Sequence, residues 1–579
     1  MNRRLLALLF CSLAAVSTAA SIRVPADAAD LPSAIAVAAD LDTIQVAASH
    51  QVAGGVVLPG RPLVILGGWD DQFTTVIGRT PLGVGSGAPS LSLAPPATGS
   101  PVVAGFVIAA GDGQVRTTPL PGRYGGGVLV EGGAPELRDL VITGGDLSGG
   151  GGLGCGGGLA LIATDAMVVG CRLEQNRATW GGGVFVQGGA PTLDGLVVID
   201  NRCGPDAAGR TAQGAGILVR QSSATVIGCE VRGGRDAVNG GGLAWLGSRG
   251  LELTVAGCEF ADNTMARDGG GLYGQDGAVS VTDCLFVGNA PAPGAEFTSG
   301  GGAYLTGARA LVQGAVFRDN RAAAGGGLTV NTGPEVTVAG CVFLANEAAQ
   351  FGAGLNYQSN EAGQIADNTL AANVNPAGAG VLNLVNTSPS LIRNLVAFNT
   401  GGGVSATSNA SVAACNDVAL NSGAAWSGLP DPTGQDGNLA ADPLFCDLAA
   451  GDLTLRDDSP CLDAPGCGGD IGALGVGCSI GVAAPAVGGP TAVAAFPNPA
   501  NPAVTIRCTL PRAGRLRVAV HDARGRLVRR LIDAPAEAGT VDVRWDGRDD
   551  RGRAVASGGY VYRVVADGVS AAGRLTLLR

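Results

Sequence analysis

The sequence predicts an all-β protein in which a right-handed parallel β-helix is followed by a second, smaller domain of strands. A phrase of glycines, a short apolar strand, a small residue or Cys, and then Asn recurs about every 26 to 33 residues, as in GGGLAWLGSRGLELTVAGCEFADN (240–263) and GGGLTVNTGPEVTVAGCVFLAN (325–346). The strands are short and rich in β-branched residues, and helical spacing is absent. A fixed period of this length means that each repeat buries its apolar face only by stacking on its neighbours.

The first element is a secretory signal peptide at residues 1–20. Arg3 and Arg4 form its charged region, Leu5 to Ala15 its apolar core, and Thr18-Ala19-Ala20 a small-residue cleavage site. No later stretch has the roughly 18 uninterrupted apolar residues of a membrane helix, so we expect no transmembrane segment in the mature chain. The protein is therefore expected to be secreted or displayed at the cell surface.

Residues 21–478 are expected to form the β-helix. Three short strands in each repeat would pair with the coils above and below at a spacing of ~4.8 Å. Runs of glycine such as 240–242 allow positive φ and close backbone approach at one corner of each coil. Residues such as Val255, Cys258 and Phe260 alternate toward the interior. Each position of the repeat therefore has a structural role.

Nine asparagines share one phase, five residues after the small residue or Cys of their copies. Asn tolerates the left-handed backbone region and can hydrogen-bond to its copies on neighbouring coils. We therefore predict a structural ladder formed by Asn176, Asn201, Asn263, Asn289, Asn320, Asn346, Asn373, Asn399 and Asn421. Glycine takes this phase in three copies, at 111, 145 and 234.

The repeat also resembles a known family. The tetrapeptides GGGV, GGGL and GGAY, with F-x-x-N at Phe260/Asn263, Phe286/Asn289, Phe317/Asn320 and Phe343/Asn346, resemble the GGA[ILV] and FxxN repeats of polymorphic outer-membrane proteins and related secreted β-helix proteins. A third Gly usually replaces the Ala of that repeat. The resemblance implies a pectate-lyase-like solenoid on an exported protein. Leu31 to Ala39 would form a short helix that caps the open end, where unpaired strand edges invite aggregation.

The end of the β-helix carries ADPLF (441–445), DLTLRDDSPCLDA (452–464) and DIGALG (470–475), which resemble the closing module of many surface β-helix proteins. Four cysteines fall in this region, and in an exported chain they predict one or two disulfides that clamp the terminal coil, with three pairings possible. These candidates are Cys446, Cys461, Cys467 and Cys478.

The inward cysteines of the repeat are expected to differ from the closing ones. Stacked side chains ~4.8 Å apart are further from each other than the Cβ atoms of a disulfide prefer. We therefore expect Cys229, Cys258 and Cys284 to be buried free thiols that pack as small hydrophobic groups.

Residues 479–492 form a Pro/Gly/Ala-rich linker, and residues 493–579 then alternate in strand fashion between turn signals. FPNP, HDARGR, WDGRDDRG and ASGGYVYR resemble the Ig-like β-sandwich of the flagellar hook-capping protein FlgD and the C-terminal sorting domains of exported bacterial proteins. The resemblance implies a handle for secretion or surface attachment, with secretion machinery such as a type IX system, or the cell envelope, as the partner.

Charge and motif content narrow the function. Acidic residues outnumber arginines before residue 490, and the formal net charge of the chain is −11, so a nucleic-acid partner is not expected. With two histidines in all, the chain has no Ser-His-Asp set, Walker loop or zinc spacing. The sequence favours a non-catalytic adhesion, binding or structural role, with a glycan or cell-surface molecule as the ligand.

The alternative is a polysaccharide lyase or glycoside hydrolase that acts on an outer face of the β-helix. Glu230 and Glu259 should face outward on adjacent coils, ~5 Å apart, with Arg232 beside them. Such a separation resembles that of a retaining glycosidase, although a solvated salt-bridge cluster explains the same residues. We expect no cofactor, because the phased acids that could suggest a Ca²⁺ site lie two coils apart, roughly 9 to 10 Å; they are Asp200, Asp262 and Asp319.

Overall fold

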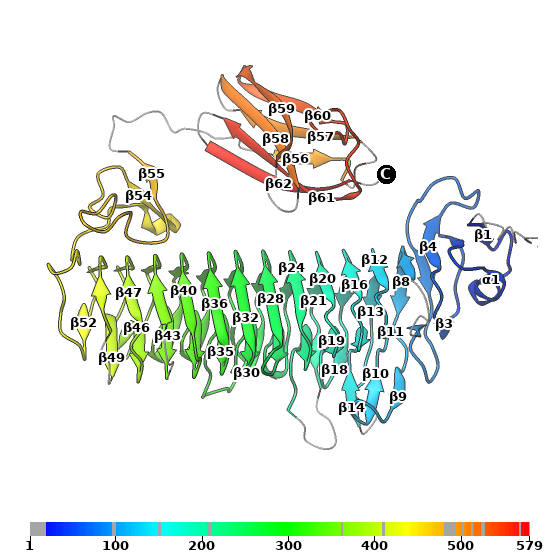
Figure 1. Ribbon diagram of the computed structural model, residues 1–579, viewed down its shortest axis with the longest axis horizontal. Helices are drawn as coiled ribbons and strands as arrows, with labels where there is room; N and C mark the ends of the chain where they lie inside the picture. Colours follow the sequence, from blue (N-terminus) through cyan, green and yellow to red (C-terminus); the bar gives the residue numbers. More distant parts are fainter. Residues whose placement is uncertain are drawn as a thin grey trace, which may run out of the picture. The chain divides into compact units, whose positions relative to one another are not determined.

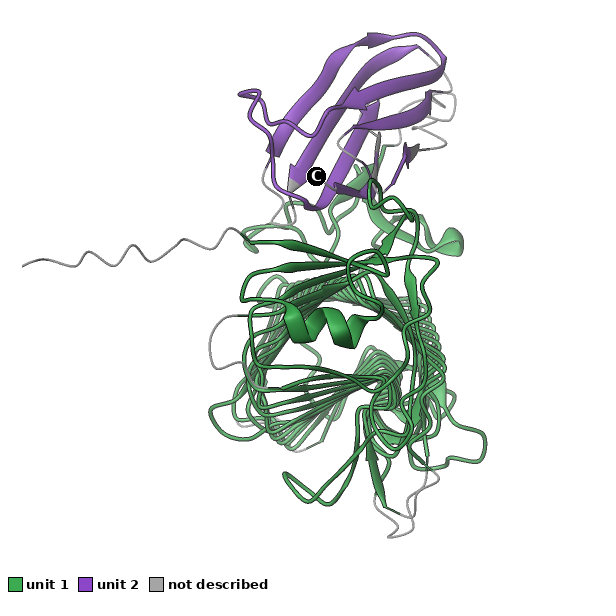
Figure 2. Cartoon of the chain, turned by 90° about the vertical axis from the view of Figure 1, so that its right-hand side faces the viewer, with its two compact units in different colours: residues 1–479 green, residues 480–579 purple. Residues whose placement is uncertain are grey.

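The computed structural model describes residues 19–94, 100–148, 152–204, 211–359, 363–407, 411–479, 493–498, 500, 503–510, 513–522, 527–566 and 569–577. The chain divides into two compact units, residues 1–479 and 480–579 (Figure 2). Most of the predicted signal peptide (1–20) and of the predicted linker (479–492) lies outside the described residues. In the part of the chain that is described, no helix is long and apolar enough to cross a bilayer.

Unit 1 is a right-handed parallel β-helix with three long parallel sheets, one strand of each sheet per coil (Figure 1). We number the sheets in the order in which the chain meets them after each glycine run. Sheet 1 has 14 strands, from β3 (Val56–Leu58) to β52 (Trp426–Ser427); sheet 2 has 15, from β1 (Ser21–Val24) to β50 (Ala413–Ala414); sheet 3 has 13, from β5 (Thr80–Leu82) to β51 (Asp417–Ala419).

The central coils carry the candidate sites and are described strand by strand. Sheet 1 contains β23 (Ile217–Arg220), β27 (Leu243–Leu246), β31 (Leu272–Gln275), β35 (Ala303–Thr306) and β39 (Leu328–Asn331). Sheet 2 contains β28 (Glu252–Ala256), β32 (Ala278–Thr282), β36 (Arg309–Gln313) and β40 (Val336–Ala339). Sheet 3 contains β25 (Glu230–Arg232), β29 (Glu259–Ala261), β33 (Leu285–Val287), β37 (Val316–Arg318) and β41 (Val342–Leu344).

The interior is one continuous apolar core built from stacked copies of the same position. Phe260, Phe286, Phe317 and Phe343 are fully buried, and the rings of neighbouring coils stack with centroids 4.8 to 5.0 Å apart. The glycine runs form a corner through positive φ and close backbone approach, as the sequence predicts. Gly240 has a φ of +64°, and a Cβ at Gly242 would lie 2.5 Å from the carbonyl oxygen of Gly271 in the next coil. No residue with a side chain fits there without moving a backbone.

A short helix, α1 (Leu31–Val37), packs at the N-terminal end of the coils, two residues shorter than predicted. Asp30 caps it by accepting a hydrogen bond from the backbone N–H of Ser33, and Pro32 lies in its first turn. Leu31, Ala34 and Ile35 are buried against the core. The helix therefore covers apolar surface that the first coil would otherwise expose.

Between sheet 3 and sheet 1 the chain makes an excursion in most coils, and several excursions form short parallel strands. We call them the side strands: β10 (Gly122–Tyr124), β14 (Leu153–Cys155), β18 (Arg177–Ala178), β22 (Arg202–Cys203), β26 (Ala237–Asn239), β30 (Thr264–Asp268), β34 (Ala290–Pro291), β38 (Arg321–Ala324) and β42 (Glu347–Phe351). In Figure 1 they lie along the lower edge of sheet 1. A second apolar cluster, which includes Tyr124, Phe185 and Tyr273, fills the space between them and the outer face of sheet 1.

The closing module follows the last coil and contains β53 (Phe445–Asp447), β54 (Asp452–Arg456) and β55 (Val476–Cys478). It folds back on the outer face of sheet 3, where Leu455 and Ile471 are buried in one cluster with Leu395. Backbone N–H groups of Gly472 and Ala473 donate to Arg393 O at 2.8 Å and Thr369 Oγ1 at 2.9 Å. The module thus covers the side of the final coils.

Unit 2 is an Ig-like sandwich of two antiparallel sheets. One contains β56 (Val493–Phe496), β57 (Val504–Leu510) and β60 (Gly539–Trp545), and the other β59 (Leu527–Ala536), β58 (Gly514–Asp522), β61 (Gly558–Ala566) and β62 (Val569–Leu577). Trp545 and Tyr560 meet edge to face in its core at 5.0 Å. Its apolar core is separate from that of the β-helix.

Candidate functional site

The structure arranges the nine phased asparagines in one buried ladder with a single gap. In each step, the backbone N–H and Nδ2 of one Asn donate to Oδ1 of the Asn in the next coil; between Asn320 and Asn346 these distances are 3.1 and 3.0 Å. Nδ2 of Asn320 also donates to Phe286 O at 2.9 Å. The gap lies at Gly234, whose N–H donates to Oδ1 of Asn263 at 2.9 Å. The ladder uses its polar atoms on itself, so it stabilises the coils and offers nothing to a ligand.

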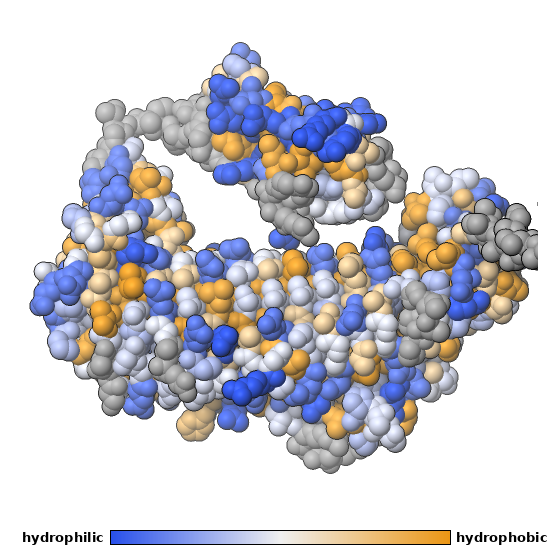
Figure 3. All heavy atoms as spheres, viewed as in Figure 1, coloured by the Kyte–Doolittle hydropathy of each residue, from blue (hydrophilic) through white to orange (hydrophobic). Residues whose placement is uncertain are grey.

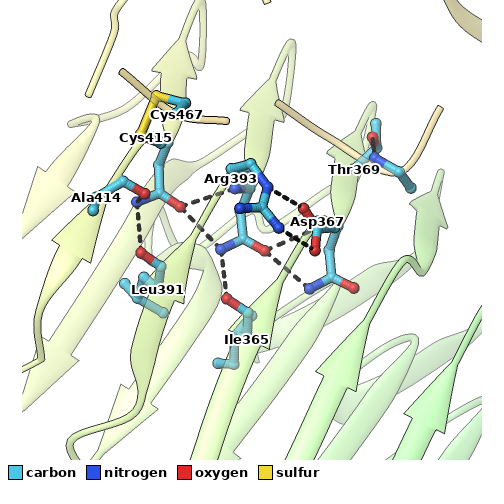
Figure 4. A network of polar contacts seen from close by, with 12 residues as sticks. Ile365, Asp367, Thr369, Leu391, Arg393, Ala414, Cys415 and Cys467 are labelled. Atoms are coloured by element: carbon cyan, nitrogen blue, oxygen red, sulfur yellow. Dashed lines mark hydrogen bonds and ion pairs between the residues drawn. A yellow bond between two sulfur atoms is a disulfide. The ribbon is translucent and has the colours of Figure 1, made fainter. Parts of the chain in front are cut away.

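A second asparagine ladder follows the corner between sheets 2 and 3 (Figure 4). Asn368, Asn394, Asn416 and Asn438 are linked by Nδ2 to Oδ1 hydrogen bonds of 2.9, 2.9 and 3.0 Å. Cysteines occupy the same corner in earlier coils. These interactions also serve structure, because the four asparagines are at most 1% exposed.

The cysteines correct one prediction. The disulfides are Cys415–Cys467 and Cys446–Cys478, and Cys461 is free and buried. Because the closing module folds back along sheet 3, Cys467 meets a corner residue of the β-helix that lies outside the predicted set. The Cys461 thiol instead donates to the buried carboxylate Asp417 at 3.2 Å. Cys229, Cys258 and Cys284 are buried and free, as predicted.

Glu230 and Glu259 are register partners on neighbouring strands of sheet 3. Nε of Arg232 lies 2.7 Å from Oε1 of Glu230, and the two side chains are 49% and 40% exposed. This is the geometry of a surface ion pair, which contributes little to stability. The predicted catalytic alternative therefore lies on an open strand face, where solvent screens both carboxylates.

A shallow groove of about 310 Å³ crosses the outer face of sheet 2. Its floor has small side chains, including Thr254, Ala278 and Ser280, and its rim carries Glu252 and the ion pair of Arg309 with Glu335 at 3.3 Å. Every charged group on the rim is exposed. The groove has no aromatic side chain and no buried polar atom that lacks a partner.

The corner where the side strands meet sheet 1 has a different character, and we call it the corner site. Gln213, Asn239, Asp268 and Ser299 are register partners on successive coils. Oε1 of Gln213 and Oδ1 of Asn239 are buried, and neither has a hydrogen-bond partner among the described residues. Asn239 is 8% exposed. Two neighbouring coils therefore present oxygen acceptors that need a donor, because a buried unpaired acceptor destabilises a fold.

Asp268 adds a partly buried carboxyl to the corner site. Burial raises its pKa to about 6, against the opposing charge of Arg267. Nε of Arg267 lies 3.4 Å from Oδ2 of Asp268, whose side chain is 14% exposed. Perturbed carboxyl groups of this kind concentrate at functional sites.

Tyrosines of sheet 1 stand beside this row. The rings of Tyr273 and Tyr304 stack with centroids 5.8 Å apart, and their hydroxyl groups bond to Gln275 Oε1 at 3.1 Å and Asn331 Nδ2 at 3.2 Å. Burial, and then the charge of Asp268, raises the pKa of Tyr273 to about 12. The hydroxyl group of Tyr273 is therefore a neutral hydrogen-bonding group at physiological pH.

At the other end of the row, the guanidinium group of Arg220 lies 5.3 Å from the ring centre of Trp180. Trp180 is the register partner of Gln213. The corner site thus combines aromatic rings, amides, a carboxyl group and a cation over adjacent coils. No group of three or more His, Cys, Asp and Glu in the described ranges is arranged to hold a metal ion.

Sequence reasoning missed the corner site. Its residues share one signal, since each stands directly before a glycine run or its equivalent: Trp180, Gln213, Asn239, Asp268 and Ser299. Polar or aromatic residues at this position could have been collected by aligning the copies on the glycines. The sequence could not have predicted that the side-chain oxygens of Gln213 and Asn239 are buried without hydrogen-bond partners, because this depends on excursions of unequal length.

Comparison with protein families gives a match within the second unit. Residues 501–569 match the family model described as FlgD Ig-like domain. This match covers a small part of the chain. No curated protein matches.

Solved structures give distant matches. Dimeric latent PorU from Porphyromonas gingivalis is 25% identical, covering 15% of this chain and 9% of its own, with a TM-score of 0.13. Tailspike protein 3 of bacteriophage CBA120 is 12% identical over 71% of this chain and 61% of its own, with a TM-score of 0.38. The Dettilon tailspike protein is 11% identical over 90% and 74%, with a TM-score of 0.23. The chain spans less than two thirds of the length of the first two.

Proposed function

We propose that this chain is an exported protein of the cell surface or the extracellular space whose β-helix binds a glycan at the corner site. The observation that carries the proposal is the pair of unpaired buried acceptors, Gln213 Oε1 and Asn239 Oδ1, on adjacent coils. Both oxygen atoms are buried in the free chain, so binding requires the two amide side chains to turn outward. Sugar hydroxyl groups repeat along an extended glycan and would then supply a donor to each coil in turn. The neighbouring Trp180 and tyrosine side chains add the apolar contact that sugar-binding sites use beside their polar groups.

The test uses the full chain and an array of immobilised glycans. Asn239→Leu removes one unpaired acceptor without removing a hydrogen bond, so the fold should keep its stability while glycan binding weakens about tenfold, the equivalent of one lost hydrogen bond. Gln364→Leu, on the outer face of sheet 2, is the matched control. Unchanged binding by the Asn239 variant would refute the corner site as the binding surface.

The second unit is proposed to direct secretion or surface attachment, through secretion machinery or the cell envelope. The match to an Ig-like domain and the difference in charge from the β-helix support a separate task. Deletion of residues 491–579 should leave the β-helix in the periplasm. Surface display at the level of the intact chain would refute this role.

A second candidate function is hydrolysis of the bound glycan, favoured by the pKa of Asp268 near 6. A carboxyl group with such a pKa is protonated often enough near neutral pH to act as a general acid. Incubation with a polysaccharide panel, with and without Ca²⁺, should release reducing ends that disappear in Asp268→Asn and persist in Glu230→Gln. Release by the Asp268 variant, or none by the intact chain, would exclude it.

A further inference from the structure

Three arginines form a ladder on the side strands. Arg177 of β18 is the register partner of Arg202 of β22, and Arg202 is the partner of Arg235 in the coil that follows. Register partners on adjacent coils lie ~4.8 Å apart. The backbone of each is fixed by the coil before it, as Arg202 N donates to Asn176 O at 2.9 Å and Arg235 N to Asn201 O at 3.2 Å. The three guanidinium groups therefore start from a regular row.

The acidic residues on this row are too few to balance the positive charge of the three arginines. Arg177 is the one member with an ion pair in the described residues, a weak one of 3.9 Å to Asp146. Its Nε is buried and has no acceptor. Arg202 and Arg235 are exposed, and neither makes an ion pair with a described residue. Like charges placed opposite each other on neighbouring strands destabilise a sheet.

Further along the helix axis, the same row contains an arginine whose charge is balanced by a carboxylate. Arg321 of β38 pairs in register with Glu347 of β42, and Nε of Arg321 lies 2.9 Å from Oε2 of Glu347. The intervening coils have Thr264 and Ala290. Charge pairing is thus available to this row, at Arg321 and, through its register partner Asp146, at Arg177, whereas Arg202 and Arg235 lack it among the described residues.

Local features keep the ladder open toward solvent. Ala178 and Cys203, next to Arg177 and Arg202 in sequence, are buried against the β-helix, so these two arginines take the other face of the side strands, and Arg235 is itself exposed. At Gly204 a Cβ would lie 3.0 Å from Arg177 Nε. Burial, and then the charge of Asp236, raises the pKa of the Cys203 thiol. Asp236, the acid next to Arg235, is exposed and forms no ion pair with a described residue.

We infer that this ladder, Arg177, Arg202 and Arg235, binds an anionic polysaccharide that runs along the helix axis. Carboxylate or sulfate groups on successive sugars would meet one guanidinium per coil, and guanidinium groups bind both through paired hydrogen bonds. The inference rests on the proposed function and names the class of glycan.

The experiment measures affinity of the full chain for polygalacturonate, dextran sulfate and neutral dextran. Each single variant, Arg202→Gln or Arg235→Gln, should weaken binding of one or both anionic polymers about tenfold, and the double variant about a hundredfold. Polygalacturonate and dextran sulfate distinguish a carboxylate from a sulfate ligand. Arg321→Gln is the matched control on the same row, with no loss expected. Because the side chains of Arg202, Arg235 and Arg321 are exposed, the variants should fold, which thermal unfolding checks.

Several results would overturn the ladder. These are full affinity in the double variant, equal affinity for neutral dextran, or equal affinity for a single-stranded oligonucleotide. Asn239→Leu separates this failure from that of the proposed function. If anionic binding falls in Asn239→Leu and not in the arginine variants, the ladder is wrong and the corner site stands; the reverse pattern keeps the ladder and rejects the corner. Loss in neither refutes both.

Discussion

The backbone N–H of Cys341 donates a hydrogen bond of 2.9 Å to Oδ1 of Asn368, which occupies the same corner one coil further on. The thiol of Cys341 donates to Val312 O at 3.6 Å, and Nδ2 of Asn368 donates to the register-equivalent Val338 O at 2.9 Å. Cysteine and asparagine therefore perform one task at this corner. The thiol performs it with longer and weaker bonds, and burial raises the pKa of Cys341 to about 12, so it stays protonated.

Extending the asparagine ladder by one coil should stabilise the β-helix. In Cys341→Asn, Oδ1 and Nδ2 would take the roles that they have in Asn368, with a gain on the order of 1 kcal/mol for each improved hydrogen bond. Thermal unfolding should therefore shift to higher temperature. The reverse change, Asn394→Cys, is the control and should shift it down. A destabilised Cys341 variant would mean that this coil lacks room for an amide.

Interrupting the first asparagine ladder should change the free energy of unfolding by more than the substitutions at residues 341 and 394. Asn320→Ala removes an acceptor for Asn289 and a donor to Asn346 and Phe286 O in a site that is 0% exposed. Buried partners left without hydrogen bonds cost on the order of 1 to 3 kcal/mol each. Hydrogen exchange should accelerate in the coils on both sides of residue 320. Asn421→Ala, at the partly buried end of the ladder, should change exchange only locally.

The contrast between ladders and corner site shows what the sequence can predict. Glycine, Cys or Asn, Phe and ladder Asn recur at fixed intervals, so their register and burial follow from the period alone, including the gap at Gly234. Asn239 and Asp268 lie in excursions whose lengths differ from coil to coil, and their surroundings come from neighbouring excursions. Cys415 was missed for a similar reason, because its partner arrives only when the closing module folds back.

Asp268 should make stability depend on pH. Its pKa is raised from an unfolded value of 3.8 to about 6, so the folded state holds the proton more tightly and stability falls as pH rises between these values. The difference is on the order of 2 to 3 kcal/mol at the site. Asp268→Asn should therefore raise the unfolding temperature at pH 8 relative to the intact chain and change it little at pH 4. Asp276→Asn is the control. An equal effect at both pH values would mean that Asp268 is not destabilised by its burial.

Disulfide mapping should give Cys415–Cys467 and Cys446–Cys478, with Cys461 alkylated only after denaturation. The first bond joins the closing module to the last coils, whereas the second lies within the module and joins β53 to β55. Cys415→Ser with Cys467→Ser should therefore let limited proteolysis release the module from sheet 3. The paired change Cys446→Ser with Cys478→Ser should expose only the end of the module around β55, because the cluster of Leu455, Ile471 and Leu395 and the Cys415–Cys467 bond remain in place. A bond between Cys461 and Cys467 would contradict the fold of the module, since it would pull the thiol of Cys461 away from Asp417 and leave a buried carboxylate without its donor.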